Sequence, residues 1–142
     1  NYKYNQNSEI MREIRYRGIG IAERKWVFGS LWFDTRDGVT LIWSEELKYW
    51  VRVDPATVGQ YTGLKDEHGK EIYEGDVIRS PLSEDKTRPH RIFYHTGNAA
   101  FMGALVDRKE LCYLRLDQDW IYKFGKEVIG NIHDNPELLK NE

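Results

Sequence analysis

Cysteine is nearly absent from this chain: its 142 residues contain one, Cys112. A single cysteine excludes an internal disulfide and is typical of a protein that works in a reducing compartment. Cys112 lies in the alternating apolar run LCYLRL, so we expect a buried and unreactive thiol rather than a nucleophile.

Long apolar runs are also missing. No stretch approaches the roughly 18 consecutive apolar residues that mark a membrane-spanning helix, and there is no hydrophobic segment of a secretory signal. We therefore expect no membrane association.

The chain has no large excess of either charge. Its 21 basic and 23 acidic residues give a formal net charge of −2. A protein dedicated to duplex nucleic acid usually has a basic surplus or a basic stripe, so this balance argues against that class without removing it.

Catalytic and metal-binding patterns are absent as well. There is no CxxC, HExxH, GxSxG, P-loop or GxGxxG pattern, and no carboxylate-rich loop. His90 and His95 are an odd number of residues apart, which places them on opposite faces of one strand. Adjacent carboxylates such as Glu45 and Glu46 fall in polar turns, where solvated charges are common. We expect no catalytic residue, no metal ligand, no cofactor and no enzymatic activity.

Aromatic residues, by contrast, are plentiful: five Trp, nine Tyr and five Phe make up 13% of the chain. Disordered chains lack such rings. Aromatic and β-branched runs alternate with turn signals at a spacing of roughly 8–12 residues, which is typical of an all-β barrel or sandwich. The length suits one domain, and no segment has the helical periodicity of a core helix.

Strands are predicted at residues 26–33, 39–43, 47–53, 91–95, 100–106, 111–116 and 127–132. The first two should form a hairpin across the turn DTRDG, and 100–106 should pair with 111–116 across DRKE. The ending HDNPELLK predicts a short helical turn with Pro136 at its first position and Glu137 in its first turn.

The first ten residues, NYKYNQNSEI, differ from the rest. They are polar, rich in asparagine, and precede Met11. We expect residues 1–10 to be a flexible or non-native extension, and residues 11–142 to form a single β domain.

The stretch Val58–Ile78, VGQYTGLKDEHGKEIYEGDVI, contains two turn signals. In DEHG, the Asp66 side chain can accept a hydrogen bond from the backbone two residues on, and Gly69 can take a positive φ. In YEGD, Gly75 is expected to take a positive φ before a strand that starts at Asp76. The charges of this stretch are expected to face water at the turn tips.

Two further glycines of the stretch, Gly59 and Gly63, enclose Tyr61. They allow a β-bulge or a close approach of another backbone. The preferred interpretation is that the whole stretch is a folding element. The alternative is a binding surface built on Gln60, Tyr61 and Tyr73.

The same residues carry a resemblance to a known family. VGQYTGLKDEHGKEIYEGDVI is similar to the hallmark motif of the YopX family of bacteriophage and prophage proteins. MREIRYRG (11–18) resembles the usual opening of the family, and VIGNIHDNPELL (128–139) resembles its usual ending. The resemblance implies a predominantly β, phage-encoded protein in the cytoplasm of the bacterial host, and it brings no established activity or catalytic residue.

One part of the motif suggests a more specific fold. EGDVI is similar to the Gly-Asp strand entry of small SH3-like barrels. We therefore expect one or two small antiparallel barrels followed by the short C-terminal helical turn. Such a fold would not by itself determine the function.

The leading functional hypothesis is a non-enzymatic protein-interaction module. Five Trp exceed what a core of this size needs, and Trp is enriched at interfaces. Trp32, Trp43, Trp50 and Trp120 are the candidates. The partner would be a second copy, giving a homo-oligomer, or a host or phage protein.

The alternative hypothesis is binding of single-stranded nucleic acid. Arg15, Arg17, Arg24 and Lys25 lie close to Trp26 in the sequence, and basic residues beside aromatic rings can form a stacking platform. The same alternation is also typical of an ordinary half-buried strand.

Overall fold

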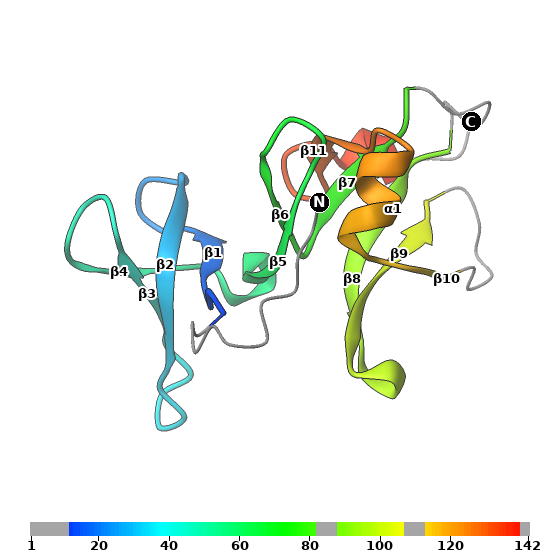
Figure 1. Cartoon of the computed structure of the whole chain (residues 1–142). Helices are drawn as coiled ribbons and strands as arrows, with labels where there is room; N and C mark the ends of the chain where they lie inside the picture. The colour runs from blue at the N-terminus through cyan, green and yellow to red at the C-terminus, as the bar shows by residue number, and fades with distance from the viewer. Residues whose placement is uncertain (1–11, 82–87, 107–112, 140–142) are drawn as a thin grey trace.

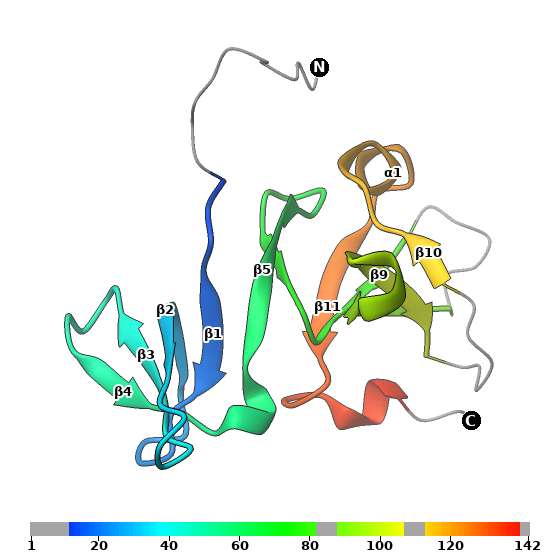
Figure 2. The same ribbon diagram turned by 90° about the horizontal axis from the view of Figure 1, so that it is seen from below.

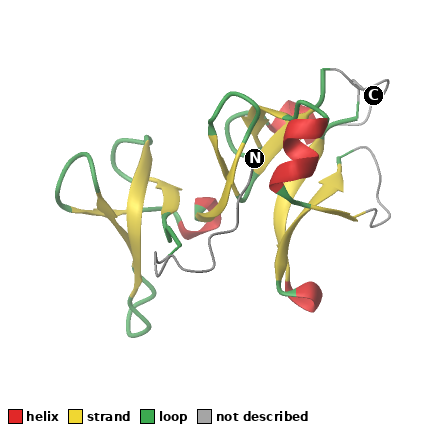
Figure 3. Cartoon of the chain, viewed as in Figure 1, coloured by secondary structure: helices red, strands yellow, loops and turns green. Residues whose placement is uncertain are grey.

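Two antiparallel sheets make up the computed structural model of the chain, which describes residues 12–81, 88–106 and 113–139. Helix is scarce in this part of the chain: one α-helix, α1 (Gln118–Lys123), and the 3-10 turns at Pro55–Thr57, Thr96–Asn98 and Pro136–Leu139 (Figure 3). The mostly β prediction is confirmed, as is the helical turn that begins at Pro136.

The first sheet has the strand order β4–β3–β2–β1–β5–β6. Its strands are β1 (Tyr16–Ile19), β2 (Trp26–Phe33), β3 (Thr40–Ser44), β4 (Trp50–Arg52), β5 (Gly59–Lys65) and β6 (Glu71–Tyr73). The predicted hairpin of β2 and β3 is confirmed. Its turn is held by Asp34, whose carboxylate accepts hydrogen bonds from the Arg36 backbone and guanidinium.

The second sheet has the order β10–β9–β8–β7–β11. Its strands are β7 (Asp76–Arg79), β8 (His90–His95), β9 (Ala100–Leu105), β10 (Tyr113–Arg115) and β11 (Glu127–Asn131). The predicted hairpin of β9 and β10 is confirmed, and β8 and β11 lie where strands were expected.

The chain passes from β6 of the first sheet to β7 of the second within two residues, Glu74 and Gly75 (Figure 1). The Gly75 amide donates to the carbonyl of Ile92 at 2.9 Å, and the Ile132 amide donates to the carbonyl of Gly75 at 2.9 Å. The second half of the family-like motif is therefore the junction of the two sheets.

Each sheet has its own hydrophobic core. The core of the first sheet is built on Val27, Ile42 and Val53, and that of the second on Ile72, Ile78, Ile92, Leu116 and Ile121. Ile72 belongs to β6 of the first sheet but packs in the second core. The β5–β6 hairpin thus joins the two halves through apolar packing as well as through the backbone.

The barrel prediction is not confirmed, because neither sheet closes on itself. The chain leaves the first sheet after β6 and enters the second instead of returning to β4. An isolated bridge between Gly20 and Val53 connects the end of β1 with the segment after β4. This single bridge is not the continuous hydrogen-bonded ladder that would close a barrel. SH3-like architecture is not confirmed either.

Two local predictions were wrong in detail. The predicted strand 47–53 is shorter, because residues 45–49 form the β3–β4 turn, with Lys48 at φ +60°. Leu47 and Tyr49, expected on the apolar face, are exposed there. Helix α1 was not predicted; Asp117 caps it by accepting a hydrogen bond from the Trp120 amide at 2.7 Å.

Candidate functional site

Asp66 organises the turn between β5 and β6. Its Oδ1 accepts hydrogen bonds from the amides of His68 (2.8 Å) and Lys70 (2.9 Å), and its Oδ2 accepts from the amide of Val128 (3.1 Å) on β11. The predicted bond to the backbone two residues on is therefore confirmed. The expectation that this charge faces water was wrong, because three amides replace water around a carboxylate that is 2% exposed.

The motif glycines have the expected geometric roles. Gly69 and Gly75 have the predicted positive φ values, +83° and +90°; Gly63, for which a bulge or close approach was predicted, has a φ of +84°. A Cβ at Gly59 would lie 2.6 Å from the carbonyl oxygen of Glu74, so the predicted close approach is confirmed there. The β5–β6 register also shifts within β5, as a bulge requires.

Arg17 forms the electrostatic centre of the junction. Its guanidinium lies 2.8 Å from Asp76 Oδ1, and the other Asp76 oxygen accepts a hydrogen bond from the Tyr73 amide. The guanidinium also lies over the rings of Trp26 (4.6 Å) and Tyr73 (5.0 Å). Burial raises the pKa of Asp76, and the Arg17 charge opposes that shift. The pair ties β1 to β7.

Arg15, also a predicted nucleic-acid contact, is engaged by carboxylates. Its guanidinium lies 2.6 Å from both Glu13 and Glu71, and 5.3 Å from the centre of the Tyr61 ring. Burial raises the pKa of the Tyr73 hydroxyl, and the nearby Glu71 adds to the shift. Tyr61 and Tyr73 are buried, which favours the folding-element interpretation of this stretch over the alternative binding surface on Gln60, Tyr61 and Tyr73.

The remaining residues of the predicted nucleic-acid surface are not assembled into a platform. The indole nitrogen of Trp26 donates to Asp134 at 2.8 Å, and one Trp26 face is taken by Arg17. Arg24 and Lys25 are exposed in the turn that follows β1. Arg15 and Arg17, the other two basic residues of the predicted surface, already have anionic partners.

A different aromatic surface is exposed on the first sheet. Cross-strand pairing places Ser30, Trp43 and Trp50 in one row and Trp32, Leu41 and Arg52 in the next, on one face. We call this face, with Phe28, the outer aromatic face. Trp32 is 57% exposed, Trp50 46% and Phe28 42%, while Trp43 packs edge-to-face on Trp50 at 5.6 Å.

Of the predicted interface tryptophans, Trp120 lies elsewhere. It is half-buried on α1, packs against the core of the second sheet, and has the Lys126 ammonium 4.5 Å above its ring. The structure thus brings together Trp32, Trp43 and Trp50 and separates Trp120 from them.

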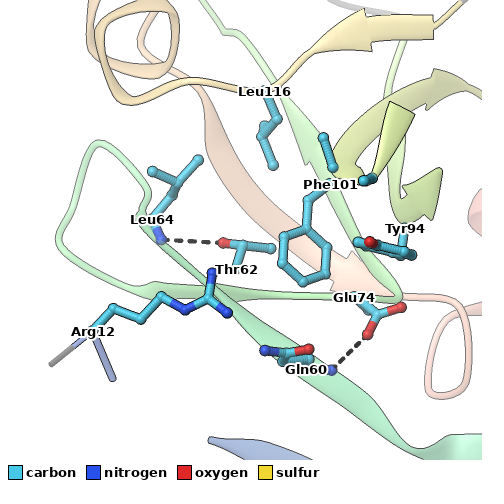
Figure 4. A pocket seen from close by; sticks show the side chains of 10 residues that line it. Arg12, Gln60, Thr62, Leu64, Glu74, Tyr94, Phe101 and Leu116 are labelled. Carbon is cyan, nitrogen blue, oxygen red and sulfur yellow. Dashed lines mark hydrogen bonds between the residues drawn. The ribbon is translucent and has the colours of Figure 1, made fainter. Parts of the chain in front are cut away.

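A groove of about 620 Å³ lies between the two sheets (Figure 4). One wall comes from β5 and carries Gln60, Thr62 and Leu64; the other carries Tyr94 and Phe101 of β8 and β9. Glu74 lies on the side of Tyr94 and Phe101, and the lining also includes Arg12, Ala99, Ala100 and Leu116. The Tyr94 and Phe101 rings meet edge-to-face at 5.4 Å.

Glu74 is the acidic group of this groove. One carboxylate oxygen, Oε1, accepts the Gln60 amide at 2.9 Å, and burial raises the pKa of Glu74 while this hydrogen bond opposes the shift. The sequence placed Glu74 at a solvated turn tip, and that prediction was wrong. Tyr94 and Phe101 were not predicted as site residues, because nothing local links them to the motif.

No cluster of three or more potential metal ligands occurs in the described ranges. Nor does any helix of the described residues have the length and apolar character to cross a bilayer. Cys112, predicted to be buried, lies outside the described residues.

Comparison with known proteins agrees with the motif. Residues 4–140 match the family described as YopX protein, so the chain belongs to the YopX family. The match begins within the segment expected to be an extension. No curated protein matches the chain. The crystal structure of protein EF1440 from Enterococcus faecalis is similar at 24% identity and a TM-score of 0.59, over 92% of this chain and 100% of that one. This likeness supports the fold alone.

Proposed function

We propose that this YopX-family chain is a non-enzymatic protein-interaction module that associates with a second copy of itself through the outer aromatic face. Family membership favours an accessory protein of a bacteriophage or prophage that acts in the cytoplasm of the bacterial host. The observation that carries the proposal is the exposure of Phe28, Trp32 and Trp50 on one face.

The position of the outer aromatic face in the molecule leaves it accessible to a second copy of the chain. Figures 1 and 2 show β2, β3 and β4 at the end of the molecule farthest from the second sheet. Trp32 and Trp50 remain 57% and 46% exposed there, while Phe28 also packs edge-to-face on Tyr73 of β6 at 5.6 Å. Clustered exposed rings are costly in water and typical of interfaces. Among the residues that define the face, only Arg52 is charged, so two copies can meet there with little repulsion.

The expected size of the contact indicates a reversible association. A fully buried aromatic side chain removes roughly 150–250 Å² from water, so burying the exposed half of three rings contributes roughly 300 Å² per copy. A standard interface needs about 800 Å² per partner. The rings would form the centre of the contact, and flanking polar residues would supply the rest, which is consistent with micromolar affinity.

Sedimentation velocity of the full chain over a concentration series tests the proposal. We expect concentration-dependent association of the wild type, and a dissociation constant at least about tenfold higher for Trp32→Ser, because hot-spot rings contribute more than 1.4 kcal/mol. Tyr122→Ser on α1 is the matched control, since Tyr122 is 55% exposed but lies away from the face. A wild type that stays monomeric, or equal association of Trp32→Ser, would contradict the proposal.

A further inference from the structure

Glu74 differs from the neighbouring carboxylates Glu71 and Asp76 in its partners. Asp76 has Arg17 at 2.8 Å, and Glu71 has Arg15 at 2.6 Å. Glu74 is half-buried, and the described residues provide it with no ion pair. Its Oε1 accepts a hydrogen bond from the Gln60 amide, and its second oxygen has no hydrogen-bond donor among the described residues.

The surroundings of that carboxylate favour a cation. Tyr94 and Phe101 lie on the same side of the groove as Glu74 (Figure 4). The face of an aromatic ring attracts a cation, and a carboxylate in a partly desolvated groove binds one more strongly than at an open surface. The Gln60 side chain, which also lines the groove, can add a neutral hydrogen-bond acceptor.

The kind of cation can be narrowed further. One carboxylate is too few for a metal ion, and no cluster of three ligands is present among the described residues. A guanidinium is planar, stacks on rings and binds a carboxylate through two parallel hydrogen bonds, whereas an ammonium is a strongly hydrated point charge. The geometry of one acid beside two rings therefore fits arginine better than lysine.

The shape of the groove favours an arginine that belongs to a polypeptide. Its volume of about 620 Å³ exceeds what one side chain fills, and it continues past Phe101 and Thr62 toward Leu64 and Leu116 (Figure 4). Leu64 and Phe101 pack against the second core and present apolar surface beside the polar groups. An extended segment could place its arginine at Glu74 and an apolar neighbour along this surface.

We propose that the groove binds an arginine side chain presented by an extended segment of a partner protein, with its guanidinium paired to Glu74 and stacked against Tyr94 and Phe101. The site is separate from the outer aromatic face, so it does not depend on self-association.

Arg12, a residue of this chain, should lower the affinity of the groove for an arginine side chain. Arg12 lines the groove on the side of Thr62, and no ion pair joins it to Glu74 (Figure 4). An incoming guanidinium would meet the repulsion of this charge. Arg12→Ala should therefore bind the arginine segment more tightly than the wild type.

The test is an NMR titration of the full chain with a capped Gly-Arg-Leu peptide, and with the same peptide carrying citrulline, the uncharged counterpart of arginine. We expect the arginine peptide to shift the backbone amides of Gln60, Glu74 and Phe101. Its affinity should be at least about tenfold that of the citrulline peptide. Capped arginine without neighbours should bind more weakly than the peptide.

Variants locate the site. Glu74→Gln keeps an oxygen for the Gln60 amide, so the fold is expected to persist while the preference for arginine over citrulline is lost. Glu46→Gln, in the exposed β3–β4 turn, is the matched control and should bind as the wild type does. Tyr94→Leu should weaken binding roughly two- to fivefold.

Three results would overturn the proposal: no shifts with the arginine peptide, equal binding of the citrulline peptide, or an unchanged arginine preference in a folded Glu74→Gln. Capped arginine that binds as tightly as the peptide would overturn the assignment to a protein segment and indicate a small cation instead. Each result can be obtained in a Trp32→Ser background, in which self-association through the outer aromatic face is weakened, and this separates it from the outcome for self-association.

Discussion

Arg17 on β1 and Asp76 at the start of β7 form an ion pair of 2.8 Å, and their side chains are 8% and 2% exposed. The pair lies where the chain crosses from one sheet to the other. Two of the family-motif residues, Tyr73 and Asp76, are therefore bound by a residue from the opening segment of the chain. In this chain the contact joins the opening segment to the central motif.

Removing one member of this pair should be strongly destabilising. Arg17→Met leaves the Asp76 charge buried without its partner, and we expect the free energy of unfolding to fall by about 3–5 kcal/mol. The double variant Arg17→Met/Asp76→Asn also removes the charge but keeps an oxygen for the Tyr73 amide, so it should recover part of the loss. Urea denaturation measures both, and equal losses would show that the charge is not the cause.

Gly59 is expected to tolerate no side chain. A Cβ there would lie 2.6 Å from the Glu74 carbonyl oxygen, so Gly59→Ala must separate β5 from the turn and should destabilise by about 1–3 kcal/mol. Gly20→Ala is the control, because its nearest neighbour would be Val51 Cγ1 at 3.4 Å. It should be neutral or raise stability by roughly 0.4–1 kcal/mol. Thermal unfolding of both variants distinguishes them, and similar losses would count against the close-approach explanation.

Replacing the Asp66 carboxylate even with the similar amide of asparagine should lower the stability of the fold. Asp66→Asn can keep Oδ1 for the amides of His68 and Lys70, but it turns an amide group toward the Val128 N–H, which then lacks an acceptor. We expect a loss of about 1–3 kcal/mol in chemical denaturation. Hydrogen exchange at Val128 should accelerate at the same time. Unchanged exchange there would contradict the assigned contact.

His133 predicts a pH dependence of stability. Burial, with the Arg17 charge, lowers the pKa of His133 below its ordinary 6.5, while Asp134 and Asp54 oppose the shift. The unfolded state therefore binds more protons than the folded state as the pH falls through about 6.5, and stability is lost.

The measurement compares urea denaturation at about pH 5.5 and about pH 7.5, on either side of the ordinary histidine pKa. His133→Asn should lose less stability on acidification than the wild type. His68→Asn is the control, because the pKa of His68 is shifted in the opposite direction. The hydrogen bond to Glu127 raises the pKa of His68, so protonated His68 stabilises the fold at low pH, and this stabilisation is lost as the pH rises. Identical pH profiles for the wild type and His133→Asn would contradict the prediction.

Features that depend on local chemistry could be predicted from the sequence. The β2–β3 hairpin and the positive φ values of Gly69 and Gly75 follow from turn residues, and the motif itself identified the family. Helix α1 was missed because its six residues are too few for a periodic pattern. The signal that could have found it was the capping position of Asp117 before a short run of helix formers.

Features that depend on tertiary contacts could not be predicted. Glu74 was assigned to solvent because its burial results from β8 and β9, which lie later in the chain. The two faces of β2 are distinguishable by alternation, but only cross-strand register shows that Trp43 and Trp50 join Trp32 on the outer side. Likewise, the ion pairs of Arg15 and Arg17 could not be predicted from the sequence, because their partners Glu71 and Asp76 lie on β6 and β7, distant in the chain.

The most direct test of the account is fluorine NMR of the full chain labelled with 5-fluorotryptophan, recorded over a dilution series and assigned with single Trp variants. We predict that the resonances of Trp32, Trp43 and Trp50 shift together with concentration, because these rings lie on the outer aromatic face, while those of Trp26 and Trp120 stay constant. If all five resonances remain unchanged, or only those of Trp26 and Trp120 move, the outer aromatic face is not where the chain associates.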